Sequence, residues 1–336
     1  MGDALWWTAA EARRATADPG WTEELLGVPM LVIDLRENDE DYGEPPGLLR
    51  APCPVVAVVS GEDRTLWSTD LLLDDGTPDV ALLGASVDEA ASALATRAAA
   101  NPTAAATLAR LLRVTVDLDV DAALEVESLA YSMLLAGPEF RHWLEQAPSP
   151  KHTDEQDVVV SERQGGVLHV TLNRPHVHNA FNAAMRDALV EALSVALTDY
   201  AVGTVEVSGN GPSFCSGGDL GEFGTTDDPV HAHLIRTGRS VGAALHQLHD
   251  RLTVRVHGAC IGAGVELPAF ARRVVAREGT TFRLPEVGMG LIPGAGGTVS
   301  LPRRIGRERT MLLALSGITL PVTDAKRWGL VDSVVE

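Results

Sequence analysis

Three glycine-rich turns in the second half of the chain constrain its fold more than any other feature. They occupy residues 214–220, 257–267 and 282–298, and the first two follow predicted strands at 203–208 and 252–256. Because glycine has no Cβ, such turns let the backbone approach a ligand closely and direct N–H groups at it. A turn that leads into a helix adds unpaired N–H groups and the positive end of the helix dipole. Two such turns that converge on one carbonyl oxygen would form an oxyanion hole.

Two glutamates accompany these turns. Glu266 closes the second turn, and Glu286 follows Pro285 in the third. Beside an enolate, one carboxylate could act as a general base and the other as a general acid. Each glutamate alone has a plainer explanation, Glu266 as an acidic residue in a first helical turn and Glu286 as a surface residue. Only their occurrence together with the turns favours catalysis.

The glycine runs do not form a nucleotide-binding motif. Residues 288–293 depart from the Gly-x-Gly-x-x-Gly fingerprint, and no Gly-Lys-Ser/Thr sequence follows any of the runs. A dinucleotide or P-loop site is therefore disfavoured.

The chain divides at residues 148–157, a polar stretch with two prolines that predicts a linker. After it, strands predicted at 167–172, 203–208 and 252–256 alternate with a helix at 182–197, as in layered α/β proteins. The second half is therefore expected to fold as an α/β unit.

Before the linker, the pattern favours helices over residues 83–147. Ser86 is suited to cap a first helix, and Asn101-Pro102 would end that helix and begin a second one. Further upstream, β-branched runs at 30–35 and 55–59 predict strands, and residues 1–24 are expected to form a helix. The second and third helices are predicted from the apolar residues Leu108, Leu111, Leu112, Leu124, Leu129, Met133 and Leu134.

Composition excludes several functions. The formal net charge of −19 argues against non-specific binding of nucleic acid, which needs clustered Lys and Arg, and only two lysines occur. No apolar run approaches the roughly 20 residues that span a bilayer, and the N-terminus does not resemble a secretory signal. The three cysteines lack metal-ligand spacing, and His231 and His233 are expected to be solvated in a polar loop. We expect a cytoplasmic protein with reduced thiols and without a metal site.

The ordered motifs from residue 158 onward resemble those of the crotonase superfamily, the enoyl-CoA hydratases and isomerases. The resemblance covers residues 173–182 (Asn-Arg-Pro-x-x-x-Asn-Ala-Phe-Asn), 214–220, 258–267, 284–298 and 325–332. Such a set is specific for a fold and less specific for a reaction, because one fold hosts many chemistries. It implies an α/β fold with the ββα spiral core of crotonases over residues 158–336.

Carried over by position, the resemblance makes Glu266 and Glu286 the catalytic residues and assigns the oxyanion hole to the N–H groups of Gly218 and Ala263. The residues that it implies for substrate binding are His178, Ala180, Ser216, Asp219, Leu220, Gly262, Pro285 and Gly294. The implied reaction adds water to a 2-enoyl-CoA or removes it, with coenzyme A as part of the substrate and no metal or redox cofactor. Double-bond isomerisation and a catalytically weak subunit that binds an acyl thioester are the alternatives. The family also implies a homo-oligomer, a trimer or a dimer of trimers.

Two positions depart from the family pattern. His178 and Gly221 stand where relatives usually carry cations near the nucleotide of coenzyme A. A thioester tethered to a carrier protein is therefore an alternative substrate. Arg174 or Arg283 is a candidate to replace the lost charge, and a solvated surface role is the alternative for either residue.

The N-terminal half suggests how the active site is covered. Crotonases continue past the Gly-Leu-Val-Asp sequence, here 329–332, into about three helices over the site, and residues 83–147 resemble those helices. Residues 1–82 resemble a degenerate crotonase core that lacks the glycine-rich turns. The hypothesis is a decayed tandem repeat whose helical N-terminal region replaces the usual C-terminal helices; an unrelated N-terminal domain is the alternative.

Overall fold

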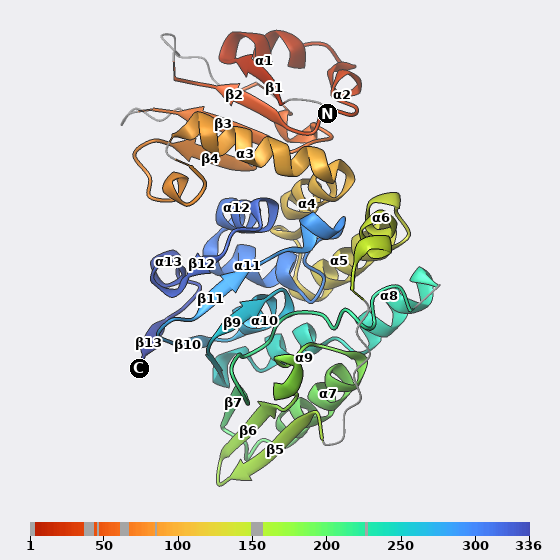
Figure 1. Cartoon of the computed structure of the whole chain (residues 1–336), viewed down its shortest axis with the longest axis vertical. Helices are drawn as coiled ribbons and strands as arrows, with labels where there is room; N and C mark the ends of the chain where they lie inside the picture. Colours follow the sequence, from red (N-terminus) through yellow and green to blue (C-terminus); the bar gives the residue numbers. More distant parts are fainter. Residues whose placement is uncertain are drawn as a thin grey trace.

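The computed structural model describes residues 4–36, 44–45, 47–60, 67–84, 86–148, 157–225 and 228–336 (Figure 1). Most of the predicted linker, residues 149–156, lies outside the described residues. The described strands form three sheets, one in the N-terminal half and two after residue 157. None of the described helices is both long and apolar enough to cross a membrane.

The largest sheet has the strand order β13-β10-β8-β7-β6-β5, and only its β5–β6 pair is antiparallel. The alternation predicted for 167–172 is confirmed, because Leu168, Val170 and Leu172 are buried and the residues between them are half-buried. The predicted helix at 182–197 is confirmed as α7 (Ala183–Thr198), which Asn182 caps. The strands are β5 (Val159–Gln164), β6 (Val167–Leu172), β7 (Thr204–Gly209), β8 (Leu252–Val256), β10 (Arg273–Arg277) and β13 (Ser333–Val335).

A second, three-stranded sheet brings two of the glycine-rich turns together. Its strands are β9 (Ala259–Ile261), β11 (Thr281–Arg283) and β12 (Leu320–Pro321). β9 and β11 are parallel, with Ile261 opposite Arg283, so the turns that follow them leave the same edge of the sheet. The second turn enters α10 (Ala263–Glu266), and the third enters the short 3-10 helix η6 (Glu286–Met289). Parallel pairing therefore places Glu266 and Glu286 next to each other.

The remaining helices of the second half surround these sheets. They are α8 (Pro229–Gly238), α9 (Val241–Gln247), α11 (Gly297–Ile305), α12 (Arg307–Ser316) and α13 (Val322–Trp328), with the 3-10 turns η3 (Pro175–Val177), η4 (His249–Arg251) and η5 (Pro268–Phe270).

The N-terminal unit is a parallel four-stranded sheet in sequential order, β1 (Leu5–Thr8), β2 (Leu31–Asp34), β3 (Val55–Val59) and β4 (Leu71–Asp74). β2 and β3 confirm the predicted strands, and alternate residues divide between two hydrophobic clusters because both faces of the sheet are covered. One face packs against α1 (Ala9–Thr16) and α2 (Trp21–Glu24).

The prediction of one helix over residues 1–24 was wrong. Residues 5–8 pair with β2 as an edge strand, and Thr8 then caps α1 in a reciprocal capping box with Glu11. The alternating exposure of this strand places Trp7 beside Trp21, with ring centroids 6.4 Å apart. Aromatic residues are common in β-strands. The pairing with β2 and the contact between Trp7 and Trp21 outweighed the helical preference of the neighbouring alanines.

Four helices connect the N-terminal sheet to the second half. They are α3 (Val87–Ala100), α4 (Pro102–Thr115), α5 (Val120–Leu135) and α6 (Pro138–Gln146). The cap at Ser86 and the break at Asn101-Pro102 are confirmed. On α5, however, Leu129 and Met133 are exposed, whereas Glu127, Ser128 and Ser132 are buried. α5 therefore presents a partly polar face to the rest of the protein.

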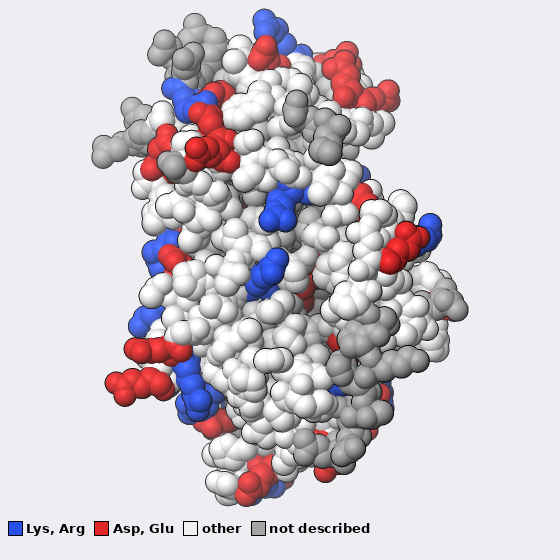
Figure 2. Space-filling view, in the orientation of Figure 1, with Lys and Arg blue, Asp and Glu red and all other residues white. Residues whose placement is uncertain are grey.

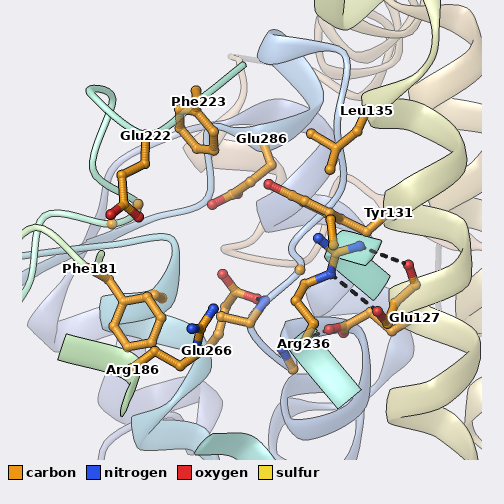
Figure 3. A pocket seen from close by; sticks show the side chains of 18 of the residues that line it. Glu127, Tyr131, Leu135, Phe181, Arg186, Glu222, Phe223, Arg236, Glu266 and Glu286 are labelled. Atoms are coloured by element: carbon orange, nitrogen blue, oxygen red, sulfur yellow. Dashed lines mark hydrogen bonds between the residues drawn. The ribbon is translucent and has the colours of Figure 1, made fainter. Parts of the chain in front are cut away.

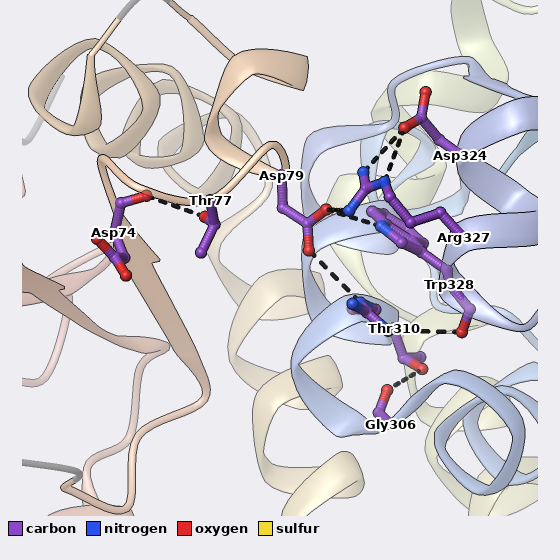
Figure 4. Close-up of polar contacts among 9 residues, drawn as sticks. Asp74, Thr77, Asp79, Gly306, Thr310, Asp324, Arg327 and Trp328 are labelled. Atoms are coloured by element: carbon purple, nitrogen blue, oxygen red, sulfur yellow. Dashed lines mark hydrogen bonds and ion pairs between the residues drawn. The ribbon is translucent and has the colours of Figure 1, made fainter. Parts of the chain in front are cut away.

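α3 and α4 lie between the N-terminal sheet and α11 and α12 (Figure 1), and one continuous hydrophobic cluster includes residues from both halves. Polar contacts reinforce this junction (Figure 4). Asp79 accepts hydrogen bonds from Arg327 Nη1 at 2.6 Å and Trp328 Nε1 at 2.8 Å, and it pairs with Arg309 at 3.4 Å. On the face shown in Figure 2, the described Lys and Arg side chains form separate spots, and acidic side chains gather over the N-terminal end.

Candidate active site

A cavity of about 900 Å³ lies between α5, α6 and α8 and the three glycine-rich turns. Glu266, Glu286, Gly218 and Ala263 all line it, although they come from three separate turns. The four residues to which the sequence assigns chemistry therefore face one space.

The backbone N–H groups of Gly218 and Ala263 are available in this cavity. Around Gly218, the backbone hydrogen bonds are made by its neighbours: Phe181 donates to Gly217, and Asp219 donates to Phe181. Ala263 is the first residue of α10, where an N–H group has no partner within the helix. Neither N–H group donates to any of the residues that the structure describes.

Each of these two N–H groups follows a glycine in a left-handed conformation. Gly217 has φ of 91° and Gly262 has φ of 50°, values that other residues rarely adopt. A Cβ on Gly262 would lie 2.4 Å from Glu286 Oε1, so this position also requires glycine for space. The glycines thus explain locally why two amides can be turned toward one site.

Glu266 is held firmly by backbone amides. Its side-chain Oε2 accepts hydrogen bonds from Ala295 N at 2.7 Å and Gly297 N at 2.9 Å, and the residue is only 2% exposed. Burial raises the pKa of Glu266 well above its usual range, with smaller contributions from the charges of Glu286 and Glu127, while the two amides oppose the shift. The orientation of this carboxyl is therefore fixed from the loop at 294–298.

Glu286 has a different environment. Its buried Oε2 has no hydrogen-bond partner among the described residues, and in Figure 3 its carboxyl points into the same space as that of Glu266. Burial raises the pKa of Glu286 to about 8, although its own N–H group and Arg283 lower it. Its environment therefore favours the protonated form of this carboxyl at neutral pH.

A third buried carboxyl, Glu127 of α5, was not predicted. Its Oε1 accepts from Gly296 N at 2.7 Å, and its Oε2 accepts from Thr298 N at 2.9 Å and Thr298 Oγ1 at 2.6 Å. Burial raises the pKa of Glu127 to about 7, despite these hydrogen bonds. The sequence feature that could have indicated Glu127 is its position on the same helical face as the apolar residues Val120, Ala123 and Leu134.

The Asn-Arg-Pro segment at residues 173–175 holds the first turn in place. Arg174, which is 1% exposed, pairs with Asp219 Oδ2 at 2.9 Å and also donates to Ala180 O. Asn179 accepts from Arg174 N and donates to the carbonyl oxygens of Asn210 and Ser213. The suggestion that Arg174 replaces a lost coenzyme A cation was wrong, because its charge is buried and paired beside the oxyanion turn.

The predicted binding residues divide into two groups. Those that line the cavity are Ser216, Asp219, Leu220, Pro285 and Gly294. His178, Ala180 and Gly262 are not among the described lining residues; His178 Nδ1 lies 2.8 Å from Ser213 Oγ. Contact of these three residues with substrate stays a prediction.

The α6 side of the cavity is aromatic. Phe140 and Trp143 of α6 surround Phe223, with ring centroids 5.8–6.1 Å apart. A Cβ on Gly218 would lie 3.0 Å from the Phe223 ring, so this ring lies directly against the oxyanion turn. The N-terminal half therefore contributes apolar side chains to the wall of the cavity in addition to Glu127.

The expectation of solvated histidines in a loop was wrong for His233. It lies on α8, is buried, and contacts Ser128 Oγ at 3.0 Å and Glu125 at 3.0 Å. Within the described part of the chain, no three His, Cys, Asp or Glu residues are grouped so that they could hold a metal ion.

Comparisons with known proteins agree with this architecture. The family model described as "Enoyl-CoA hydratase/isomerase" matches residues 162–336. The 2,3-dehydroadipyl-CoA hydratase of Escherichia coli is 38% identical over 178 residues, which are 53% of this chain and 69% of that protein. The mevalonyl-coenzyme A hydratase sidH of Aspergillus fumigatus is 32% identical over 185 residues, or 55% of this chain and 68% of that one.

Solved structures give the same result. A structure from Mycobacterium abscessus, described as a "putative Enoyl-CoA hydratase/isomerase", superposes with a TM-score of 0.50 at 35% identity, covering 53% of this chain and 70% of that one. An enoyl-CoA hydratase from Mycobacterium smegmatis gives a TM-score of 0.50 at 32% identity, covering 54% and 70%. Together with the matching family model, these likenesses show that the chain belongs to the enoyl-CoA hydratase/isomerase family, the crotonase superfamily.

Proposed function

We propose that this protein adds water to a 2-enoyl-CoA thioester, or removes water in the reverse direction. One observation carries the proposal: a single cavity is lined by two backbone N–H groups that donate to none of the described residues, by the buried carboxyl of Glu266 and by the half-buried carboxyl of Glu286. Such an arrangement can stabilise an enolate oxygen and move two protons beside it.

The proposed reaction begins with the thioester oxygen accepting hydrogen bonds from Gly218 N and Ala263 N. The Glu266 carboxylate takes a proton from water as the water oxygen attacks C3, and the alkene electrons move onto the thioester oxygen to give an enolate. When the enolate collapses, C2 takes a proton from the Glu286 carboxyl. The Glu266 proton returns to Glu286 through solvent or the product hydroxyl, so water is added with no net change to the enzyme.

The environments of the two glutamates support these roles. Oε2 of Glu286 has no partner in the described part of the chain, and its pKa is raised to about 8, which suits a carboxyl that delivers a proton. Glu266 receives two amide hydrogen bonds, which favour its ionised form. When Glu286 and Glu127 carry protons, their charges no longer oppose ionisation of Glu266. Hydration uses both carboxyls, whereas isomerisation needs only one to move a proton.

Coenzyme A is the proposed carrier, in keeping with the names of the relatives. The arginines that line the cavity are Arg141, Arg186, Arg236 and Arg239, and Arg141, Arg186 and Arg239 are candidates to compensate for the cations missing at His178 and Gly221. Of these, Arg186 and Arg239 already pair with Asp187. Binding of a carrier-protein thioester is the alternative.

We also propose that the helices α3–α6, from the segment at 83–147, take the place of the helices that follow the core in other crotonases. The contribution of α5 and α6 to the cavity supports this assignment. The parallel sheet within residues 1–82 supports descent from a second crotonase core. The homo-oligomer and the cytoplasmic location stay predictions.

Turnover of crotonyl-CoA and longer 2-enoyl-CoAs tests the function. Hydration appears as loss of enoyl absorbance with a 3-hydroxyacyl product, isomerisation as a shifted alkene of unchanged mass, and a binding subunit as neither. Glu266→Gln and Glu286→Gln should each lower the hydration rate by about 10²–10⁴. Glu278→Gln, an exposed carboxylate remote from the cavity, is the matched control. Hydration that survives in both active-site variants would contradict the proposed roles.

A further inference from the structure

Arg236 of α8 lines the cavity without an anionic partner. Its Nε donates to Ser128 Oγ at 3.2 Å, and its Nη2 donates to Ser128 O at 3.4 Å and to Ser132 Oγ. No carboxylate among the described residues lies within ion-pair distance of it, and Nη1 donates to none of them. Burial lowers the pKa of Arg236, which reflects the cost of holding a cation there.

Glu127 and Glu266, two carboxyls of the same cavity, are held by backbone amides. Both oxygens of Glu127 accept hydrogen bonds from residues 296 and 298, and Glu266 Oε2 accepts from residues 295 and 297. Glu127 attracts Arg236 through space without contacting it. A half-buried guanidinium that keeps an unused donor group facing a cavity is well placed to bind an anionic group of a ligand through a charge-assisted hydrogen bond.

Tyr131 of α5 adds a second polar group beside this cation. The Arg236 guanidinium carbon lies 4.9 Å from the centre of the Tyr131 ring, within cation–π range. The hydroxyl of Tyr131 donates to none of the residues that the structure describes, and burial raises its pKa, so that it remains a donor. A Cβ on Gly294 would lie 2.2 Å from this ring, which shows how closely the third turn fits against it.

The arrangement of the cavity indicates which part of a substrate would meet Arg236. In the view of Figure 3, Glu266 and Glu286 lie between Phe181 and Glu222 on one side and Tyr131 and Arg236 on the other. With the thioester at the oxyanion turns and C2 and C3 at the glutamates, the distal acyl carbons would extend toward Arg236. A simple alkyl chain would leave the guanidinium unpaired and desolvated.

We propose that the acyl group of the substrate ends in a carboxylate, which Arg236 binds with help from the Tyr131 hydroxyl. This inference rests on the proposed function, because it assigns the substrate class of the same site. Paired with the acyl carboxylate, the guanidinium gains the charge-assisted hydrogen bond that the protein does not supply. Arg236 thereby selects dicarboxylic over monocarboxylic acyl groups.

Binding of saturated thioesters tests this selection without requiring turnover. Adipyl-CoA and hexanoyl-CoA differ only at the distal end, so contacts with the coenzyme A phosphates cancel between them. The wild-type protein should bind adipyl-CoA about 10- to 100-fold more tightly, as measured by titration calorimetry. The corresponding pairs of thioesters with four and eight acyl carbons test whether a shorter or a longer acyl group places its distal end at Arg236.

Variants at position 236 then locate the effect. Arg236→Gln should remove the preference and weaken adipyl-CoA binding while changing hexanoyl-CoA binding little, and Arg236→Lys should restore part of the preference. Arg255→Gln removes an exposed, ion-paired cation on β8 and should leave the preference intact. The wild-type comparison stands by itself if the buried variant fails to fold.

The outcomes separate this inference from the hydratase proposal. Equal affinities for the dicarboxylic and monocarboxylic acyl-CoAs at every chain length would overturn the carboxylate site. It would also be overturned if Arg236→Gln weakened the binding of adipyl-CoA and hexanoyl-CoA by the same factor. With 2-hexenedioyl-CoA and 2-hexenoyl-CoA as substrates, hydration of both at equal efficiency would leave the hydratase intact and reject the carboxylate site. A tenfold preference in binding without hydration of either substrate would support the site and reject the hydratase.

Discussion

Glu127 and Glu266 accept hydrogen bonds from alternating amides of residues 295–298, where the loop of the third glycine-rich turn enters α11. Glu266 binds the N–H groups of Ala295 and Gly297, and Glu127 binds those of Gly296 and Thr298, all at 2.7–2.9 Å. The loop is therefore held on one side by a residue of the crotonase core and on the other by α5 from the N-terminal half. This arrangement makes the position of the proposed base depend on a helix outside the core.

Glu127→Gln should lower hydration without touching the substrate. The amide keeps one acceptor oxygen and places an N–H₂ group against donors, so the loop and Glu266 must shift. A displacement of about 1 Å at a reacting group can cost about 10²-fold in rate, and we expect a loss of roughly that size in kcat/KM. The pH profile should change as well, because the variant removes a charge that raises the pKa of Glu266.

Glu139→Gln is the matched control for this prediction. Glu139 of α6 also accepts from two backbone amides, Thr103 N at 2.7 Å and Ala104 N at 3.0 Å, but it does not line the cavity. The Glu139→Gln variant should be less stable than wild type by about 1.5–3 kcal/mol, the range for hydrogen bonds to a charged group, as should Glu127→Gln. Unlike Glu127→Gln, it should keep the wild-type pH profile of hydration. Identical kinetic changes in both variants would reduce Glu127 to a structural role.

The rate of hydration should fall on the alkaline side of about pH 8. Glu286 must be protonated to deliver a proton, and its pKa is raised to about 8, so the active form is lost as the pH passes that value. A profile of kcat/KM against pH measures this limb. In Glu286→Gln the residual activity should lack it; an unchanged alkaline limb in the variant would assign that titration to another group.

The same residue should make folding stability depend on pH. The pKa of Glu286 is about 8 in the folded protein against 4.5 when exposed, so the native state holds a proton that the unfolded state releases. Its favourable contribution is complete below pH 4.5 and is lost as the pH rises through 8. The Tm of Glu286→Gln relative to wild type should therefore increase between pH 5 and pH 9, whereas Glu278→Gln should show no such trend.

The sequence could predict those parts of the site that come from neighbouring residues. Gly262, Ala263 and Glu266 lie within one turn, and the β9–β11 pairing brings Glu286 beside them. Their convergence follows from local motifs and from the rule that parallel strands end at the same edge of a sheet. The predicted strands at 30–35 and 55–59 were recognisable for a similar reason, because continuous β-branched runs indicate burial on both faces.

Glu127 and Arg236 could not be found in this way. Both residues make their contacts between the N-terminal and C-terminal halves of the chain. No local sequence pattern predicts which face of α5 packs against the core. The apolar residues Leu129 and Met133 indicated the helix but do not mark its inner face: both are exposed, and the inner face of α5 carries the polar groups that line the cavity. The edge strand at Leu5–Thr8 was missed because its identity depends on pairing with β2.

Gly262→Ala should damage the site specifically. The residue has φ of 50°, and the added Cβ would lie 2.4 Å from Glu286 Oε1, so the substitution both strains the backbone and displaces the proposed acid. We expect hydration to fall by about 10²-fold or more, measured as kcat.

Gly279→Ala separates strain from displacement. Gly279 has φ of 74°, but a Cβ there would meet nothing within 4 Å. This variant should lose stability by about 1–2 kcal/mol through the left-handed conformation alone and keep its activity. Full activity in Gly262→Ala would show that Glu286 can move without consequence.

Residues 158–336 should not form an active protein without the preceding half. Removal of 1–147 would expose the surfaces of α11 and α12 that α3 and α4 cover, and it would delete Glu127 from the loop beside Glu266. Co-expression of 1–147 should restore a soluble complex with activity, because the two halves share one hydrophobic cluster. Size-exclusion chromatography with turnover of crotonyl-CoA measures both. If 158–336 alone stayed folded and fully active, the proposal that the N-terminal helices complete the site would fail.

A variant at the junction turns this test into an affinity measurement. Asp79→Ala removes the acceptor for Arg327 and Trp328 and the partner of Arg309, all from α12 and α13 (Figure 4). Since these groups are partly exposed, we expect association of the two fragments to weaken by about tenfold. Asp117→Ala removes an exposed carboxylate from the same fragment and should leave the affinity unchanged. Because Asp79 does not line the cavity, the reassembled variant should regain full activity at saturating fragment concentration, which distinguishes docking from catalysis.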